Sequence, residues 1–121
     1  MQMTKSIVPH FTLMDEANVT QLVKMRGEAK KVGEQYGVKV TFLPFIMKAL
    51  IATAREFPMF NASIDDAAEE IVYKKYFNMG FAADTPQGLL VPVVKDADQK
   101  SILQLSKEIQ ELATKAREGK L

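Results

Sequence analysis

The sequence predicts a domain of the α+β or mixed α/β class, in which helices cover a sheet. Three stretches space their apolar residues as amphipathic helices do, and a region of short β-prone runs lies between the second and the third. A further β-prone stretch precedes the first helix. The expected order along the chain is therefore strand, helix, helix, several strands, helix.

The first expected element is a strand over about residues 8–15. Phe11 and Leu13 would face one side of the sheet, and the residues between them the other. Pro9 cannot donate a hydrogen bond to a neighbouring strand, so we expect little pairing close to it.

A helix is expected next, over about residues 18–36. Asn18 is placed to cap its first turn, and Gln21 follows at the spacing of a capping box. Gly37 is placed as the left-handed residue that commonly ends a helix.

The second helix is expected to begin at Thr41 and to end at Pro58. Pro44 is acceptable in its first turn, because the N–H that proline lacks would have no partner there. Residues 42–57 are apolar around nearly the whole circumference. Such a helix is buried on most sides, either within a large core or against another subunit. Its Met and Phe side chains fit those contacts better than a cofactor pocket.

Short strands are expected between residues 60 and 94, at Asn61–Ile64, Ile71–Tyr73, Phe77–Ala83 and Leu89–Val94. Asp65 and Asp66 would form a turn after the first strand. The stretch from Thr85 to Gly88 has Pro and Gly where a type I turn favours them. The last two strands are therefore expected to form a hairpin.

The last helix, over residues 101–118, has the clearest pattern. Ser101 and Gln104 form a capping-box pair at its start. Apolar residues then recur in steps of three and four, and Gly119 is expected to stop the helix.

The composition limits the function classes. The 121 residues suffice for one domain, and 16 basic and 15 acidic residues leave a formal charge of +1, without the long basic run typical of a nucleic-acid footprint. The absence of cysteine excludes disulfides, thiolate metal sites and a cysteine nucleophile. No apolar run is long enough for a membrane helix, and the N-terminus lacks the pattern of a signal peptide. We therefore expect a soluble intracellular protein with neither nucleic-acid nor membrane partners.

Four stretches of the chain resemble a known family, in its order and at its spacing. They are Pro9-His-Phe-Thr-Leu-Met-Asp-Glu-Ala-Asn-Val19, Val40-Thr-Phe-Leu-Pro44 with Lys48-Ala-Leu50, Phe81-Ala-Ala-Asp-Thr-Pro-Gln-Gly-Leu-Leu-Val-Pro-Val93 and Glu111-Leu-Ala-Thr-Lys-Ala-Arg117. The family is the catalytic core domain of the dihydrolipoyl acyltransferases of 2-oxoacid dehydrogenase complexes. The sequence is most similar to its bacterial pyruvate dehydrogenase members.

The resemblance implies an α/β fold like that of chloramphenicol acetyltransferase, a two-layer domain with a mixed sheet and helices on one face. Residues 1–121 would be the N-terminal half of that domain. It further implies trimers that assemble into a large core in the bacterial cytoplasm. The lipoyl domain and other subunits of the complex would be the partners.

The implied reaction transfers an acetyl group between dihydrolipoyl lysine and coenzyme A, without a metal ion. The family's general base is a histidine in an Asp-His-Arg-x-x-x-Asp-Gly segment, and its Ser/Thr-Asn-x-Gly stretch supplies an oxyanion donor. Neither segment occurs in this chain. We therefore expect a fragment that contains no catalytic residue and is inactive alone. The alternative is a non-catalytic structural or oligomerisation module of the same fold.

The resemblance assigns the best site candidates to the expected hairpin. Asp84, Gly88 and Leu89 would line the lipoyl side of a substrate channel. The competing interpretation is structural: Asp84 would cap the turn, and Gly88 would supply flexibility.

Three other groups of residues have simpler explanations. His10, the only histidine, could act as a base, but a structural role in the first strand fits the family better. Acidic residues near the first turn could suggest a divalent cation, but a solvated turn is the simpler interpretation; these are Asp65, Asp66, Glu69 and Glu70. Lys74 and Lys75 are interpreted as surface charge.

One physical consequence follows for the chain on its own. A missing half would leave apolar surface of the 42–57 helix, or an open strand edge, uncovered. We therefore expect an exposed apolar patch and self-association.

Overall fold

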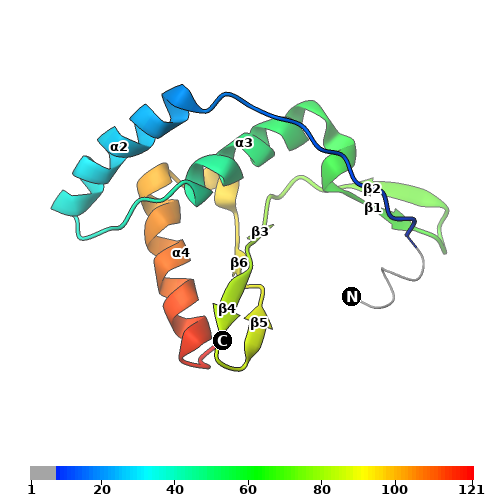
Figure 1. The fold of residues 1–121 in the computed structure, drawn as a ribbon. Coiled ribbons are helices and arrows are strands. Elements are labelled where there is room, and N and C mark those ends of the chain that lie inside the picture. The colour runs from blue at the N-terminus through cyan, green and yellow to red at the C-terminus, as the bar shows by residue number, and fades with distance from the viewer. Residues whose placement is uncertain (1–7) are drawn as a thin grey trace.

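The computed structural model describes residues 8–121. Within this range two helices come first, six short strands follow, and a third helix comes last, as Figure 1 labels them. The helices are α2 (Thr20–Gln35), α3 (Leu43–Glu56) and α4 (Ile102–Arg117), with short 3-10 helices η1 (Pro58–Asn61) and η2 (Ala97–Gln99). The strands are β1 (Ala62–Asp65), β2 (Glu70–Tyr73), β3 (Met79–Gly80), β4 (Ala83–Thr85), β5 (Gly88–Leu90) and β6 (Val93–Val94). The expected α/β class is confirmed.

The strands pair in three antiparallel ladders of two strands each, β1 with β2, β3 with β6 and β4 with β5. Within residues 8–121 the mixed sheet expected for the family is therefore present only as these separate ladders. Helix α4 lies along the β3–β6 hairpin and contacts β4 and β6. No helix in this described range is long and apolar enough to cross a membrane.

The core lies between α3, α4 and the long hairpin formed by the four strands from β3 to β6. Its buried apolar members are Met47, Ile51, Phe81, Ala83, Val94, Ala97, Leu105 and Ala116. Each of these elements therefore contributes one apolar face to a single cluster.

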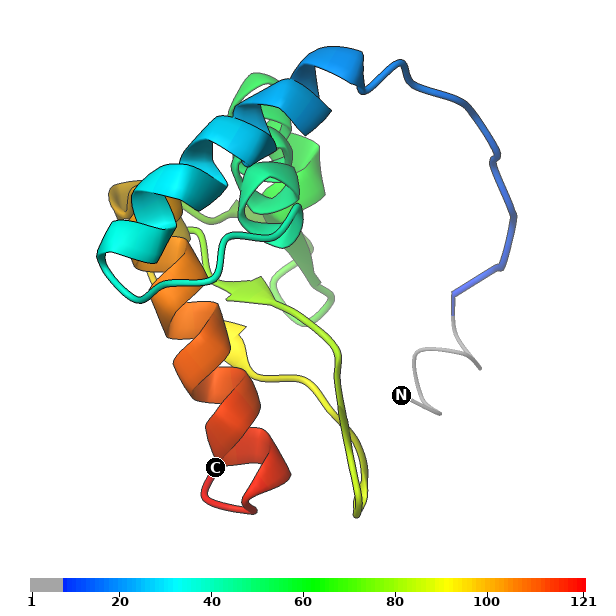
Figure 2. The ribbon, with the colours of Figure 1, turned by 60° about the vertical axis from the view of Figure 1, so that its left-hand side comes forward.

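The strand expected at residues 8–15 is wrong. Residues 8–19 contain neither helix nor strand, and Figure 2 shows this segment standing away from the rest of the molecule. A strand exists by hydrogen bonding to a second strand, and no described strand lies beside this one. Phe11 and Leu13 are consequently 87% and 84% exposed.

Helix α2 confirms the expected helix, but its predicted N-terminal capping box is wrong. The helix begins at Thr20, so Val19 occupies the cap position and contributes no side-chain hydrogen bond. Asn18 instead accepts hydrogen bonds from the backbone N–H and the hydroxyl of Thr20, at 3.0 and 2.7 Å. The helix begins one residue later than the sequence predicts. Gln21 is therefore its second residue, whereas a capping-box side chain reaches back to the cap from the third.

The C-terminal end of α2 is as predicted. Gly37 has a φ of +69°, the left-handed conformation that favours glycine. The N–H of Val38 donates to the carbonyl of Gly33 at 2.9 Å, and the N–H of Gly37 donates to that of Glu34 at 3.3 Å. These two bonds form a Schellman motif, which turns the chain toward α3.

Helix α3 confirms the second predicted helix, with Pro44 in its first turn. Only one face of it is buried in this chain, through Pro44, Met47 and Ile51. Apolar side chains elsewhere on the helix and at its two ends are exposed, namely Phe42, Ile46, Leu50 and Phe57. The expectation of an uncovered apolar surface on this helix is therefore confirmed.

Helix α4 matches its prediction most closely. The Ser101 hydroxyl accepts from the backbone N–H of Gln104 at 3.2 Å, and the Gln104 side chain accepts from the N–H of Ser101 at 2.8 Å. Gly119 follows the helix with a φ of +71°. Both ends are thus set by local sequence signals.

The predicted hairpin is confirmed, but each of its arms is two short strands instead of one. The arms that were expected over Phe77–Ala83 and Leu89–Val94 form β3 and β4, and β5 and β6. Met79 pairs with Val94 and Ala83 with Leu90, so both ladders share one register. Between them Phe81 faces Pro92, which has no N–H to donate.

Candidate functional site

The hairpin has a buried face that packs toward α4. Its members are Phe81, Ala83, Thr85, Pro92 and Val94. Three of them, Phe81, Ala83 and Val94, belong to the same core cluster as Leu105 of α4. The alternation of strand side chains then places the residues between them on the opposite face.

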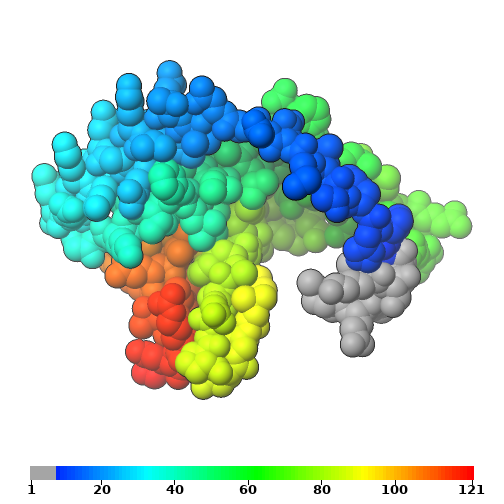
Figure 3. Space-filling view, viewed as in Figure 1, coloured from blue at the N-terminus to red at the C-terminus, as the bar shows by residue number. Residues whose placement is uncertain are grey.

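This opposite face, which we call the outer face, consists of Asp84, Leu89, Val91 and Val93. Asp84 and Leu89 are direct partners in the β4–β5 ladder, so their side chains lie next to each other. Leu89 is 67% exposed and Val91 60% exposed. Figure 3 shows the hairpin as a projecting lobe beside the C-terminal part of α4.

The turn at the hairpin tip explains why Gly88 is needed. Gly88 pairs with Thr85 and has a φ of +118°, which residues with a side chain rarely adopt. A Cβ there would meet no atom within 4 Å, so backbone conformation and not space requires the glycine. The Thr85 hydroxyl donates to the Gly88 carbonyl at 2.5 Å and holds the turn closed.

The structure thus brings the three predicted site residues together. Asp84 and Leu89 are cross-strand neighbours, and Gly88 precedes Leu89 at the tip. Within residues 8–121 the hydrogen bond that closes this turn comes from Thr85, and Asp84 takes no part in the ion pairs. The Asp84 carboxylate is exposed beside apolar neighbours.

No described hydrogen bond or ion pair joins His10 to Asp84, Gly88 or Leu89. His10 is exposed on the irregular segment 8–19, so the predicted role in a strand is not fulfilled in this chain. No described hydrogen bond or ion pair orients its imidazole ring. A base needs such an orienting partner and a proton donor within reach.

The acidic residues near the first turn lie at the far end of the β1–β2 hairpin. Asp65 and Glu70 are paired in the ladder, and Asp66 and Glu69 belong to the turn between them. All four are exposed, and Asp65 accepts from the backbone N–H of Ala68 at 3.3 Å. Among residues 8–121 no group of three or more potential ligand side chains is close enough to hold a metal ion.

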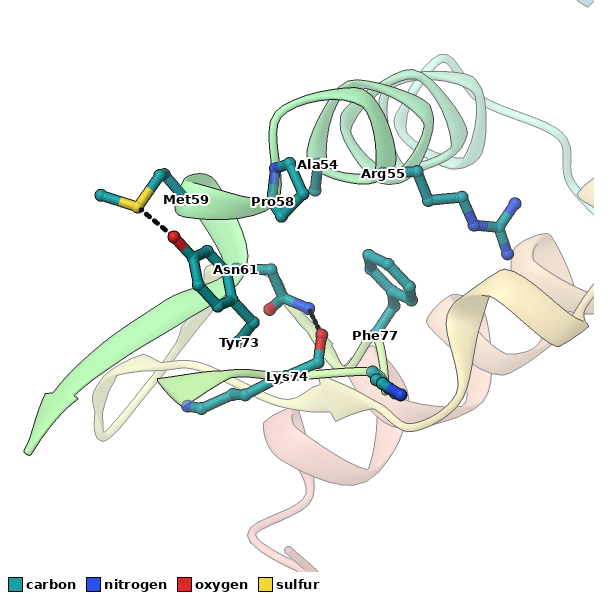
Figure 4. Close-up of a pocket in the computed structure, with 9 residues that line it drawn as sticks. Ala54, Arg55, Pro58, Met59, Asn61, Tyr73, Lys74 and Phe77 are labelled. Carbon is teal, nitrogen blue, oxygen red and sulfur yellow. Dashed lines mark hydrogen bonds between the residues drawn. The ribbon is translucent and has the colours of Figure 1, made fainter. Parts of the chain in front are cut away.

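Sequence reasoning missed a concave surface elsewhere on the molecule. A pocket of about 540 Å³ lies at the C-terminal end of α3, where η1 and the end of β2 meet. Figure 4 shows Pro58, Met59 and Tyr73 on one side of it and Arg55 and Phe77 on the other. Its lining includes Lys74 and Lys75, which the sequence analysis interprets as surface charge, and the residues that form it are brought together by tertiary packing.

Comparison with known proteins relates the whole chain to one family. The model of the 2-oxoacid dehydrogenase acyltransferase catalytic domain matches residues 1–121. The acetyltransferase component of the pyruvate dehydrogenase complex of Bacillus subtilis is 55% identical over 118 residues, 98% of this chain and 27% of that protein. The corresponding component of Staphylococcus aureus strain N315 is 52% identical over the same shares.

Solved structures agree with the sequence comparison. A structure of Azotobacter vinelandii dihydrolipoamide acetyltransferase superposes with a TM-score of 0.94 at 46% identity, covering 99% of this chain and 49% of that one. A truncated catalytic core of the 2-oxoacid dehydrogenase complex from Thermoplasma acidophilum gives 0.87 at 41%, covering 99% and 54%. The chain spans about a quarter of the length of the curated relatives that it matches, and about half of the solved ones. It belongs to the 2-oxoacid dehydrogenase acyltransferases, as part of their catalytic domain.

Proposed function

We propose that this chain forms the N-terminal half of the catalytic core of an acetyltransferase. The proposed reaction moves an acetyl group between dihydrolipoyl lysine and coenzyme A. Support comes from the relatives, which are named dihydrolipoyllysine-residue acetyltransferases and are more than 50% identical to this chain. Acetyl is proposed over other acyl groups on the same ground.

We propose that Asp84, Gly88 and Leu89 line the lipoyl side of the substrate channel. The observation that carries this proposal is the pairing of an exposed carboxylate, Asp84, with exposed Leu89 on a face that α4 does not cover. A lipoyl-lysine arm is mostly hydrocarbon with one amide N–H. Leu89 and Val91 offer apolar contact to such an arm, and Asp84 offers an acceptor for its N–H.

The proposed reaction also needs a base for the incoming thiol and a hydrogen-bond donor for the developing oxyanion. His10 is the only histidine of the chain, and it lies exposed on a segment without regular structure. We therefore propose that the base and the oxyanion donor come from outside these 121 residues. This chain would supply one wall of the channel and no catalytic group.

The test is acetyl transfer from acetyl-CoA to free dihydrolipoamide. We expect no turnover by the 121-residue chain, and turnover by a longer chain that extends through the family's histidine-containing segment. Turnover by the 121-residue chain itself would contradict the proposal. A His10→Ala substitution would then show whether that histidine is the base.

The proposed partners follow from the same assignment. We propose that copies of the chain associate through exposed apolar surface into a trimer-based core, with the lipoyl domain and other subunits of a bacterial cytoplasmic complex as partners. A structure of the cubic core of a pyruvate dehydrogenase complex has a TM-score of 0.94 to this chain at 45% identity. The exposed Leu89, Val91 and Ile46 supply apolar surface for such contacts.

The exposed apolar surface also favours the second candidate, a structural or oligomerisation module without catalysis. The same assay separates the two functions. A longer chain that assembles but transfers no acetyl group would support the module, whereas turnover would support the enzyme.

A further inference from the structure

The tip of the β4–β5 hairpin combines a glycine with a very short ladder. The ladder has three residue pairs, which are Ala83–Leu90, Asp84–Leu89 and Thr85–Gly88. Beyond them Pro92 interrupts the hydrogen bonding toward β6, because proline has no N–H to donate. A short ladder of two strands is only marginally stable, so the tip needs further contacts to hold one conformation.

Gly88 is the least constrained residue of this tip. Its φ of +118° lies in a region that glycine adopts far more readily than other residues. The space where a side chain would lie is open, so packing at that point does not limit the rotation of Gly88. The direction of Leu89 follows from that rotation, because the Gly88 carbonyl and the Leu89 N–H belong to one planar peptide unit.

The hydroxyl of Thr85 supplies the constraint that glycine lacks. It donates to the Gly88 carbonyl at 2.5 Å from the strand position directly opposite. Thr85 lies on the buried face of the hairpin and is only 7% exposed, so water has little access to compete for its hydroxyl. The bond fixes the plane of the peptide unit that joins Gly88 to Leu89. A side chain on the buried face thereby determines how Leu89 is presented on the outer face.

We infer that Thr85 is a positioning residue for the lipoyl arm, which acts through Leu89 and does not touch the arm itself. The inference rests on the proposed function, in which Asp84 and Leu89 contact that arm. A Leu89 side chain without a fixed direction must be ordered when the arm binds, and that ordering lowers the affinity. The Thr85 bond orders the tip before the substrate arrives.

A bond that acted on stability alone would have a different signature. Its loss would lower the free energy of unfolding and affect both substrates alike. Positioning of Leu89 concerns one substrate, because the outer face is assigned to the lipoyl side of the channel. The KM values for the two substrates therefore distinguish positioning from stability.

Thr85→Val tests the inference, because valine keeps the shape and the strand preference of threonine and lacks the donor. In the longer, catalytically complete chain we expect the KM for dihydrolipoamide to rise about threefold to tenfold, the range that one hydrogen bond covers. The kcat and the KM for acetyl-CoA should equal those of the parent protein. Thr85→Ser keeps a hydroxyl at the same position, so it should restore the parent KM.

Thr114→Val is the matched control for the chemical change. The Thr114 hydroxyl also donates to a backbone carbonyl, that of Gln110 at 2.9 Å, but it lies on the exposed side of α4. Its kinetics should equal those of the parent protein. In ¹⁵N relaxation measurements on the 121-residue chain, we expect Thr85→Val to lower the order parameter of the Leu89 amide. Thr85→Ser and Thr114→Val should leave that order parameter unchanged.

Binding of dihydrolipoamide to the longer chain, followed by the methyl signals of Leu89, requires no turnover and tests Thr85 even when acetyl transfer fails. Weaker binding in Thr85→Val with recovery in Thr85→Ser supports the inference. Equal increases in both KM values, or unchanged binding in Thr85→Val, overturn it and leave the proposed function standing. If dihydrolipoamide shifts no Leu89 signal in the parent protein, the proposed channel wall and this inference are both wrong. Thr85→Ala, which also removes the donor, takes the place of a valine variant that fails to fold.

Discussion

Phe81 lies directly opposite Pro92, and the hydrogen bond between the two residues runs in one direction only. The N–H of Phe81 donates to the Pro92 carbonyl at 3.0 Å, and proline has no N–H with which to return a bond. The ladder is interrupted here, but its register is the same on both sides. A bulge would shift the pairing by one residue and exchange the faces, whereas this interruption leaves Asp84 and Leu89 on the outer face.

The first prediction concerns these two residues in the longer, catalytically complete chain. We expect Asp84→Asn and Leu89→Ala to raise the KM for dihydrolipoamide by about threefold to tenfold, because each removes one contact to the lipoyl arm. The KM for acetyl-CoA should stay unchanged. Steady-state kinetics with each substrate varied in turn provides the measurement.

The matched control for the charge is Asp66→Asn. Asp66 is exposed in the β1–β2 turn and loses the same charge, so its kinetics should equal those of the parent protein. A KM for acetyl-CoA that rises together with that for dihydrolipoamide would place the outer face outside the lipoyl side of the channel.

Elements with strong local signals could be predicted from sequence. Helix α4 has a capping box and a terminal glycine, and both features form as expected. The hairpin tip is also local, since Pro86 and Gly88 determine the turn. The hydrogen bonds in these two places join residues that are close in sequence, so the predictions needed no knowledge of the tertiary packing.

Two of the failures are features that depend on distant partners, whereas the α2 capping box failed because that helix begins one residue later than its local signal indicated. The strand expected at residues 8–15 has the right alternation, but strand formation requires a neighbouring strand, and among residues 8–121 none lies beside this segment. The pocket at the C-terminal end of α3 was missed because Asn61 and Phe77 are brought together by tertiary packing. The site residues Asp84 and Leu89 came from the family resemblance, and sequence alone placed them only on opposite arms of a hairpin.

The second prediction uses two glycines of α2 that differ only in surroundings. A Cβ at Gly33 would meet the carbonyl oxygen of Val38 at 2.6 Å and the Val40 side chain at 2.8 Å. We expect Gly33→Ala to lower the free energy of unfolding by roughly 1–3 kcal/mol, because a backbone atom cannot move aside cheaply. Urea denaturation followed by circular dichroism measures the change.

Gly27→Ala is the internal control for that experiment. A Cβ at Gly27 would meet nothing within 4 Å, and alanine favours the helix over glycine by roughly 0.5–1 kcal/mol. We therefore expect stabilisation from the same chemical change on the same helix. Equal effects of the two substitutions would contradict the close packing of α2 against Val38.

The third prediction concerns the start of α4. Ser101→Ala removes the hydroxyl that accepts from the N–H of Gln104, and we expect it to cost about 1 kcal/mol of unfolding free energy. Thr114→Ala removes an exposed hydroxyl from the same helix, where it bonds only to the carbonyl of Gln110. Because alanine is the better helix former, this control should be neutral or stabilising. A neutral Ser101→Ala would show that the capping box contributes nothing to stability.

The fourth prediction concerns self-association through the outer face of the hairpin. Val91 and Val93 are 60% and 44% exposed, on a face that α4 leaves uncovered. Apolar surface of this kind drives association, and an apolar dye should compete for it. We expect the chain to form oligomers in analytical ultracentrifugation and to bind a hydrophobic dye.

Threonine has nearly the shape of valine and a high preference for strands, so Val91→Thr with Val93→Thr changes polarity and leaves the hairpin intact. We expect this double variant to shift the oligomers toward monomer and to bind less dye. Met25→Gln on α2 is the control, because Met25 is exposed on another element and its loss should leave the association unchanged. If the control lowers association as much as the double variant, the contact is spread over the whole apolar surface, and the outer face has no special role in it.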